Sequence, residues 1–210
     1  VEAKRVESWI TAYVLLLKLE RPKLIPAGLL RRWLGRIAEE AHYITQNLKP
    51  SRNHRTFQLY AIFLAGVVFP EFRWAQSFVA EARSKLCENL LNDFAPGGVH
   101  IERSTHYHNI TLETALSFVE LARLNKIDAP PELCERLYSA LLFAAYAQLP
   151  DGEIPLINDS DTLDHSGMFE AGFRLFRDPA LQWVSSRGAQ GAPLPTPSRD
   201  FDGYLILSDS

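Results

Sequence analysis

Two short clusters hold most of the side chains in this sequence that could bind an anion or transfer a proton. They are Arg52-Asn-His-Arg55 and His100-Ile-Glu-Arg-Ser-Thr-His-Tyr-His108. Each precedes or opens an apolar stretch with helical spacing, which places its polar groups near the start of a helix. There the unpaired backbone N–H groups and the helix dipole favour negative charge. The two clusters together therefore favour an anion-binding surface that also carries histidines.

Both clusters also allow a purely structural explanation. Ser51 or Asn53 could simply cap the first of these helices. Ser104 or Thr105 could cap the second in the same way, with solvated polar neighbours. A single cluster of this kind is more often a cap than a site, but two clusters that pair histidine with anion-binding groups favour function.

Other kinds of catalytic centre find less support. His106 and His108 are two residues apart, so on a helix they point to different faces, and no further ligand pair supports a zinc site. No metal and no cofactor is therefore predicted. The sequence also lacks the G-x-S-x-G turn of a serine hydrolase. An acidic stretch from Asp151 to Asp161 could supply the paired carboxylates of a glycosidase, but its Pro-Asp-Gly and Asn-Asp-Ser runs are more typical of turns.

The composition is that of an ordinary globular protein. The 210 residues are 47% hydrophobic and 22% charged, with a formal net charge of −3, which argues against a dedicated nucleic-acid binder. No apolar run reaches membrane-spanning length. Cys87 and Cys134 lie in helical patterns and are expected to be buried free thiols. The chain opens at Val1 without a signal peptide, so we expect a processed chain or a fragment, and the location in the cell is not indicated.

Helical periodicity runs through almost the whole chain. It predicts an all-α fold of stacked antiparallel hairpins, which could form a bundle, a solenoid or an α/α toroid. The expected helices span about 1–19, 27–48, 53–69, 70–94, 105–124, 130–149, 163–176 and 180–185. Gly188 to Arg199 has the composition of a linker, and Tyr204-Leu-Ile-Leu207 is a β-prone run after Asp202-Gly203. Because one strand cannot stand alone, this run either pairs with part of the helical domain or begins a β domain that the chain does not complete, and we favour the second.

Four stretches of the sequence resemble the heparinase II/III-like polysaccharide lyases. Arg52-Asn-His-Arg55 with Ala61-Ile-Phe-Leu-Ala-Gly66 resembles the Asn-His helix start of that family. Gly97-Gly98 with the second cluster resembles its Gly-Gly-x-x-x-Glu-x-Ser-x-x-Tyr-His segment. Pro150-Asp-Gly-Glu-Ile-Pro-Leu-Ile-Asn-Asp159 resembles a third stretch, and Ser198 to Leu207 resembles the entry to the family's β-sandwich. The four occur in the family's order.

The resemblance implies a fold and a division into domains. Residues 1–187 should form an incomplete (α/α) toroid, 188–200 a Pro-rich linker, and 201–210 the first strand of a truncated β-sandwich domain. The partners that the resemblance implies are an anionic polysaccharide, which lies between toroid and sandwich, and that β domain of the same protein. Neither nucleic acid nor a membrane is expected, and the location would be periplasmic or extracellular.

The resemblance also implies β-elimination on a uronic-acid-containing glycan. In this chemistry a donor neutralises the uronate carboxylate, a base removes the C5 proton, and an acid protonates the departing O4. Asn53 is expected to bind the carboxylate, with His54 as a second ligand or as the base. Tyr107 is expected to be the acid, or both base and acid. Arg55, Glu102, His106 and His108 are expected to contribute to substrate binding or to support these groups.

The sequence departs from the family pattern at two places, and two other functions remain as alternatives. Pro96 stands where an Asp is common, and Thr105-His106 replaces the expected spacer. A toroidal glycoside hydrolase using the acidic stretch is one alternative, and a non-catalytic helical scaffold or glycan-binding domain is the other. The lyase hypothesis predicts that Asn53, His54 and Tyr107 line one open groove, about 10 Å or less apart.

Overall fold

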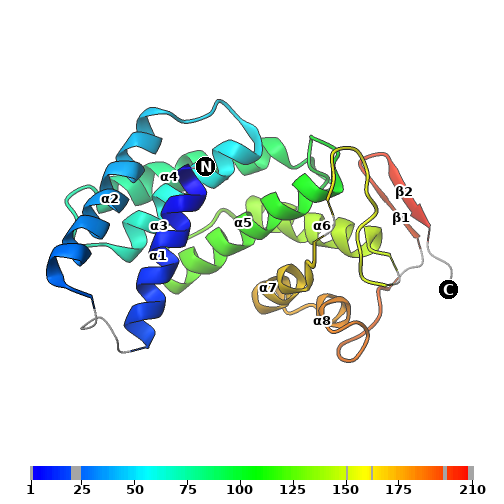
Figure 1. Ribbon diagram of the computed structural model, residues 1–210. Helices are drawn as coiled ribbons and strands as arrows, with labels where there is room; N and C mark the ends of the chain where they lie inside the picture. Colours follow the sequence, from blue (N-terminus) through cyan, green and yellow to red (C-terminus); the bar gives the residue numbers. More distant parts are fainter. Residues whose placement is uncertain (1, 20–24, 150, 162, 196–197, 208–210) are drawn as a thin grey trace. The chain divides into compact units, whose positions relative to one another are not determined.

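The computed structural model describes residues 2–19, 25–149, 151–161, 163–195 and 198–207. The chain comprises two compact units, Val1–Asn89 and Leu90–Ser210. Regular structure among the described residues consists of eight helices and one two-stranded antiparallel hairpin (Figure 1). The sequence-based expectation of a mainly α chain with no sheet beyond a hairpin near Tyr204 is confirmed for these residues.

The first unit is formed by helices α1 to α4. Their bounds are α1 Glu2–Lys18, α2 Ala27–Gln46, α3 Arg52–Val68 and α4 Ala75–Asp93, of which α4 continues into the second unit. Helix α1 packs against α2 and α3, and α2 packs against α3 (Figure 1). Helix α3 has nine buried residues, against three in α1 and three in α2, as its nearly continuous apolar sequence predicts. Gly66 lets α3 approach α4, because a Cβ there would lie 2.8 Å from the Ala75 carbonyl oxygen.

The start of α4 differs from the prediction. The helix was expected from Pro70 but begins at Ala75, since residues 70–74 form turns. In these turns the Phe72 N–H donates to the Phe69 carbonyl at 3.2 Å, and the Ala75 N–H donates to the Phe72 carbonyl at 3.0 Å. The Phe72 ring stacks on Trp74 with centroids 4.9 Å apart. Aromatic packing of this segment thus competes with the helix that its periodicity favours.

The second unit is built on α5 and α6. Helix α5 is Thr105–Leu124, α6 is Pro131–Ala147, α7 is Ser166–Phe176 and α8 is Pro179–Ser185. Helix α5 packs against α6 and α7, and α6 also contacts α7 and α8 (Figure 1). The Tyr138 hydroxyl on α6 donates to the Asp178 carboxylate at 2.5 Å, and Asp178 in turn caps α8 through the Ala180 N–H. The predicted bounds of α5 agree with the structure.

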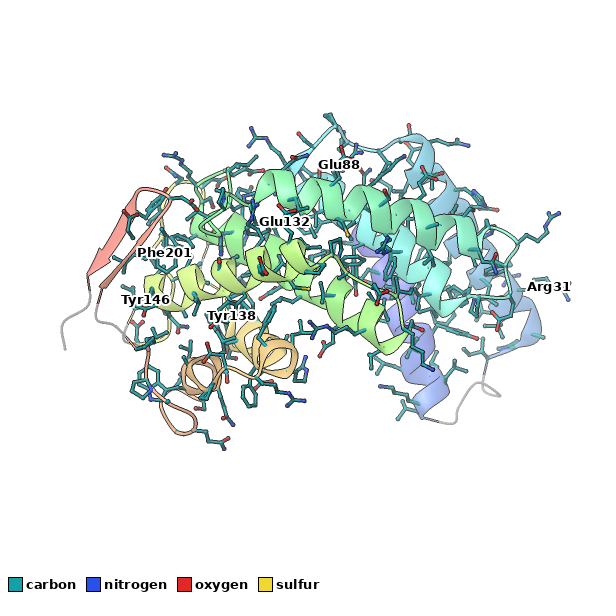
Figure 2. The ribbon with its side chains drawn as sticks, turned by 180° about the vertical axis from the view of Figure 1, so that it is seen from behind. Arg31, Glu88, Glu132, Tyr138, Tyr146 and Phe201 are labelled. Carbon is teal, nitrogen blue, oxygen red and sulfur yellow. The ribbon has the colours of Figure 1, made fainter. Side chains whose placement is uncertain are left out.

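A β-hairpin packs on the C-terminal part of α6. Its strands are β1 Ser198–Phe201 and β2 Tyr204–Leu207, joined by Asp202-Gly203 with φ values of 46° and 88°. Positive φ at both turn residues matches the twist that a two-residue hairpin needs. Phe201 is buried against Val99, Phe143 and Tyr146, and Figure 2 shows Phe201 beside Tyr146, with ring centroids 5.6 Å apart. This burial stabilises a hairpin that would be marginal alone.

Two further expectations concern the cysteines and membranes. Cys87 and Cys134 are both free thiols, as predicted, although only Cys87 is buried and Cys134 is partly exposed. Within the described ranges, no helix combines the length and the apolar character that crossing a membrane requires. The assignment of 188–200 as a linker and of 201–210 as the start of a β domain stays a prediction.

Candidate active site

The first polar cluster forms the start of α3. Asn53 is 4% exposed, and its Oδ1 accepts a hydrogen bond from the His54 backbone N–H at 2.6 Å. Arg52 has a φ of 69°, in the left-handed region that non-glycine residues seldom adopt. The Nδ2 of Asn89 on α4 donates to Thr56 Oγ1 at 2.9 Å and to the Arg52 carbonyl at 3.4 Å. Asn89 therefore helps to fix the first turn of the helix and the position of Asn53.

The neighbours of Asn53 differ in what they contact. The His54 side chain is exposed. The Arg55 guanidinium donates to the Lys49 carbonyl at 2.9 Å and so ties the preceding loop to the helix. Ser51 occupies the N-cap position, but its side chain makes no capping hydrogen bond. His54 is thus accessible to a ligand, whereas Asn53 is buried.

The second polar cluster forms the start of α5, which a later segment holds in place. We call residues 155–160 the capping segment. Ser104 is the N-cap, and its Oγ accepts from the Tyr107 N–H at 3.2 Å and donates to the Asp159 carbonyl at 2.7 Å. Thr105 Oγ1 donates to the Pro155 carbonyl at 2.5 Å. The backbone N–H groups of a first helical turn have no partner within the helix, and here the Ser104 side chain supplies one to the Tyr107 N–H.

Further hydrogen bonds fix the capping segment on both sides of Asp159. Ser160 Oγ accepts from the His106 N–H at 3.3 Å and donates to the Ile157 carbonyl at 2.6 Å. Asn158 Nδ2 donates to the carbonyl of Arg103 at 2.5 Å. Arg103 has a φ of 53°, so this backbone turns sharply just before the helix begins. The segment and the helix start form one hydrogen-bonded structure.

Tyr107 lies at the centre of this structure. Its side chain is half-buried, and its hydroxyl donates to Asp159 Oδ2 at 3.1 Å. This hydrogen bond, together with the negative charge of Asp159, raises the pKa of Tyr107 above its usual value. The His106 ring packs edge-on against the Tyr107 ring, with centroids 5.4 Å apart. Asp159 was not among the predicted site residues, since its Asn-Asp-Ser context favours a turn, although it ends the stretch that resembles the family.

His108 is a buried residue of α5 whose side chain joins the start of the helix to its neighbours. It is 2% exposed, its Nδ1 accepts from the His100 N–H at 3.3 Å, and its Nε2 lies 3.1 Å from the Ala140 carbonyl of α6. The ring therefore carries its proton on Nε2. Burial lowers the pKa of His108 to about 3, so the ring is neutral near pH 7. Glu102 is half-buried in the loop before the helix, where its N–H donates to His100 Nδ1 at 3.3 Å.

Gly97 and Gly98, which precede this loop, each lie too close to a neighbouring group for a side chain to fit. Asp202 of the hairpin accepts from the Gly97 N–H at 2.9 Å and the Val99 N–H at 3.1 Å. A Cβ on Gly97 would lie 2.6 Å from that carboxylate. Gly98 has a φ of 96°, and a Cβ there would lie 2.3 Å from the Ala140 nitrogen. The pair thus lets the loop pack against both the hairpin and α6.

The predicted site residues form two groups in the structure. Asn53, His54 and Arg55 share the start of α3 in the first unit, while Glu102, His106, Tyr107 and His108 gather at the start of α5 in the second. The convergence of the two groups on one groove stays a prediction. Among the residues that the structure describes, no three His, Cys, Asp or Glu side chains form a group suited to a metal ion.

The chain matches a known family over most of its length. Residues 2–181 match the model of the heparinase II/III N-terminus, so the chain belongs to this family. It is 25% identical over 180 residues to a heparin-sulfate lyase of Pedobacter heparinus, a match that covers 81% of this chain and 27% of the relative. A heparin-sulfate lyase of Bacteroides thetaiotaomicron is 27% identical over 199 residues, or 85% of this chain and 28% of the relative. The chain thus spans about a quarter of the length of these relatives.

Solved structures share the fold. A crystal structure of heparinase III matches 98% of this chain with a TM-score of 0.85 and 23% identity, and the match covers 34% of that protein. The heparan sulfate lyase HepC of Pedobacter heparinus matches 94% of this chain with a TM-score of 0.75 and covers 32% of the solved chain. These matches confirm the predicted fold class, the incomplete (α/α) toroid of stacked helical hairpins.

Proposed function

We propose that this chain is the helical part of a polysaccharide lyase that cleaves a uronic-acid-containing glycan by β-elimination. The observation that carries the proposal is the Tyr107 hydroxyl, held at the start of α5 within the segment that resembles the family's Tyr-His motif. Membership of the heparinase II/III family supports it. The activity named for the two relatives makes heparan sulfate the first substrate to test.

Asn53 is proposed to bind the uronate carboxylate. The C5 proton of a uronate is weakly acidic until the adjacent carboxylate is neutralised, so the site needs a fixed donor near that group. Asn53 is held at a helix N-terminus, where negative charge is favoured, and its Oδ1 already accepts the His54 N–H. That bond engages the amide oxygen, so the amide nitrogen is the donor that we propose for the carboxylate. Asn89 supports this arrangement by holding the first turn.

Tyr107 and His54 are proposed to handle the protons. His54 is exposed next to Asn53 and serves either as the base at C5 or as a second carboxylate ligand. Tyr107 has a hydroxyl with a proton available for the departing O4. His106 and Glu102, both half-buried beside Tyr107, are proposed to line the subsite. His108 has both ring nitrogens engaged inside the protein, so we propose that it supports the site by positioning α5.

Two carboxylates of the acidic stretch have local roles, which favours lyase chemistry over a hydrolytic pair of carboxylates. Asp151 Oδ1 accepts from the Glu153 N–H at 2.9 Å, as in an ordinary turn. Asp159 accepts from Tyr107 and lies in the capping segment. We further propose that the chain from residue 188 up to the hairpin is a linker, and that the hairpin, which begins at Ser198 within the predicted linker, starts a β domain of the natural protein. The polysaccharide would then be bound by the helical part together with that domain.

The nature of the products tests the proposed function. β-Elimination creates a C4–C5 double bond in the new end sugar, which absorbs ultraviolet light, whereas hydrolysis creates none. The intact natural protein should release ultraviolet-absorbing products from heparan sulfate or from another uronate glycan in a panel. Asn53→Ala should lower turnover by about 100- to 1,000-fold, the effect of losing one fixed donor to a developing anion. Products without ultraviolet absorbance, or no reaction with any uronate glycan, would contradict the proposal.

A further inference from the structure

Asp159 is the one charged side chain that contacts the Tyr107 hydroxyl in the described part of the second unit. The contact joins residues that are 52 positions apart in the sequence. Asp159 is exposed, and it reaches Tyr107 from the capping segment. Its backbone is fixed, since its own carbonyl accepts from the N-cap Ser104 at 2.7 Å and its neighbours bind Arg103 and His106.

We propose that Asp159 is a positioning residue that keeps the proton on Tyr107 and so commits Tyr107 to the acid step of the reaction. The inference rests on the proposed lyase function and decides between the two roles left open for Tyr107. A phenol that serves as the base must first lose its proton. A phenol that donates to a fixed carboxylate is held in the protonated form. The geometry therefore assigns Tyr107 to the leaving O4 and leaves proton abstraction to another group, for which His54 is the candidate.

The other charged groups around Tyr107 act in the same direction. Glu102, in the loop before α5, and Asp161, just after the capping segment, both add negative charge that raises the pKa of Tyr107. The ring of His106, the neighbouring titratable group on α5 itself, packs edge-on against the phenol. Three carboxylates from two segments thus disfavour a tyrosinate, and Asp159 does so most strongly because it also accepts the hydrogen bond.

Tyr107 as the acid and a separate base account for every proton and electron pair in the elimination step. The base removes the C5 proton, and the electron pair of the C5–H bond becomes the C4–C5 double bond. The C4–O4 bond breaks, and O4 takes the proton that Tyr107 carried. The Tyr107 oxygen is then negative beside Asp159. This unfavourable state is relieved when water, or the protonated base, returns a proton to the phenol and restores the starting form.

Titration of the Tyr107 phenol tests the inference without any need for activity. Tyrosine labelled with carbon-13 at Cζ reports phenol ionisation by NMR, and Tyr107→Phe identifies the signal. The wild-type phenol should titrate above the ordinary value of about 10, and Asp159→Asn should bring it back toward that value. Asp161→Asn is the matched control, because it removes a nearby carboxylate that makes no hydrogen bond to Tyr107, and it should give a clearly smaller shift. Equal titration of wild type and Asp159→Asn would overturn the inference.

Kinetics of the intact protein then assign the role of Tyr107. If Tyr107 is the acid, Asp159→Asn lowers the pH at which the alkaline limb of kcat falls, since the phenol loses its proton earlier. If Tyr107 is the base, the same variant gains activity at neutral to alkaline pH, which would overturn the assignment. Asp159→Ala also removes the acceptor that orients the hydroxyl, and it should lower kcat by up to about 100-fold with KM nearly unchanged. An absence of ultraviolet-absorbing products in wild type would contradict the lyase function and leave the phenol titration as a separate result.

Discussion

The starts of α3 and α5 contain the same kinds of residue but are supported in different ways. In each, an arginine in the left-handed region precedes the helix start or opens it, with a φ of 69° at Arg52 and 53° at Arg103. A serine occupies the N-cap position and histidines follow in both. At α3 the serine makes no capping bond, the histidine is exposed, and Asn89 fixes the backbone. At α5 the serine caps, and the capping segment binds the whole first turn.

Under the proposed function, the difference between the two helix starts indicates that they have different roles in the reaction. An open helix start with an exposed histidine suits a group that must meet a substrate and its carboxylate. A fully bonded helix start suits a hydroxyl that must keep a defined direction while it transfers a proton, because misplacement of a reacting group is costly.

Removal of the Tyr107 hydroxyl should have the largest effect. In the intact protein, Tyr107→Phe should lower turnover by about 100- to 10,000-fold, the usual contribution of a general acid. Folding should be nearly unaffected, because the hydroxyl contacts one exposed carboxylate and the ring remains. The rate of ultraviolet-absorbing product formation measures the effect. Tyr43→Phe, at a tyrosine of α2 that is 54% exposed, is the matched control and should keep wild-type turnover. Near-normal kcat in Tyr107→Phe would show that Tyr107 is not the acid.

The sequence predicts the helix starts better than it predicts what holds them. The Ser104 cap and the apolar spacing that follows it locate α5 from local information alone. The partner of Tyr107 comes from a segment 52 residues later that has no regular structure, so no periodicity reports it. For the same reason the local patterns between Asp151 and Asp161 favour turns over a reactive pair of carboxylates and do not reveal the contact with Tyr107. A local pattern did mislead at Pro70, where aromatic packing replaced the expected first turn of α4.

The packing before α5 should make Gly98 intolerant of substitution. Gly98→Ala places a methyl group 2.3 Å from the Ala140 nitrogen at a φ of 96°. Strain and overpacking should lower the free energy of unfolding by about 2–5 kcal/mol. Gly35→Ala, in the helix that precedes α3, has open space around its Cβ and should instead raise stability by about 0.5–1 kcal/mol. Denaturant titrations compare the two. A small loss of stability in Gly98→Ala would show that the loop before α5 can move away from α6.

The buried histidine at the start of α5 should make the stability of the protein depend on pH. His108 has a folded-state pKa of about 3 and an ordinary value of 6.5, so the unfolded chain binds its proton first as the pH falls. The stability that neutral His108 contributes is complete above pH 6.5 and is lost between about 6.5 and 3, at no more than about 1.4 kcal/mol per pH unit. His108→Gln should therefore flatten the dependence of unfolding free energy on pH in this window. Identical slopes in wild type and His108→Gln would contradict the buried, neutral histidine.

The smallest expected effect is also the most direct test of the comparison, because it makes the same change at both helix starts. Ser104→Ala removes the acceptor of the Tyr107 N–H and the donor to the Asp159 carbonyl. Loss of such a cap costs typically about 1 kcal/mol, and the freed capping segment should also show faster amide hydrogen exchange at His106 and Tyr107. Ser51→Ala removes a hydroxyl that makes no capping bond, so a change within about 0.5 kcal/mol is expected. If the free energy of unfolding falls by the same amount in both alanine variants, the start of α3 is capped as firmly as that of α5. The proposed division between an open carboxylate-binding end and a fixed proton-donating end would then lose its structural basis.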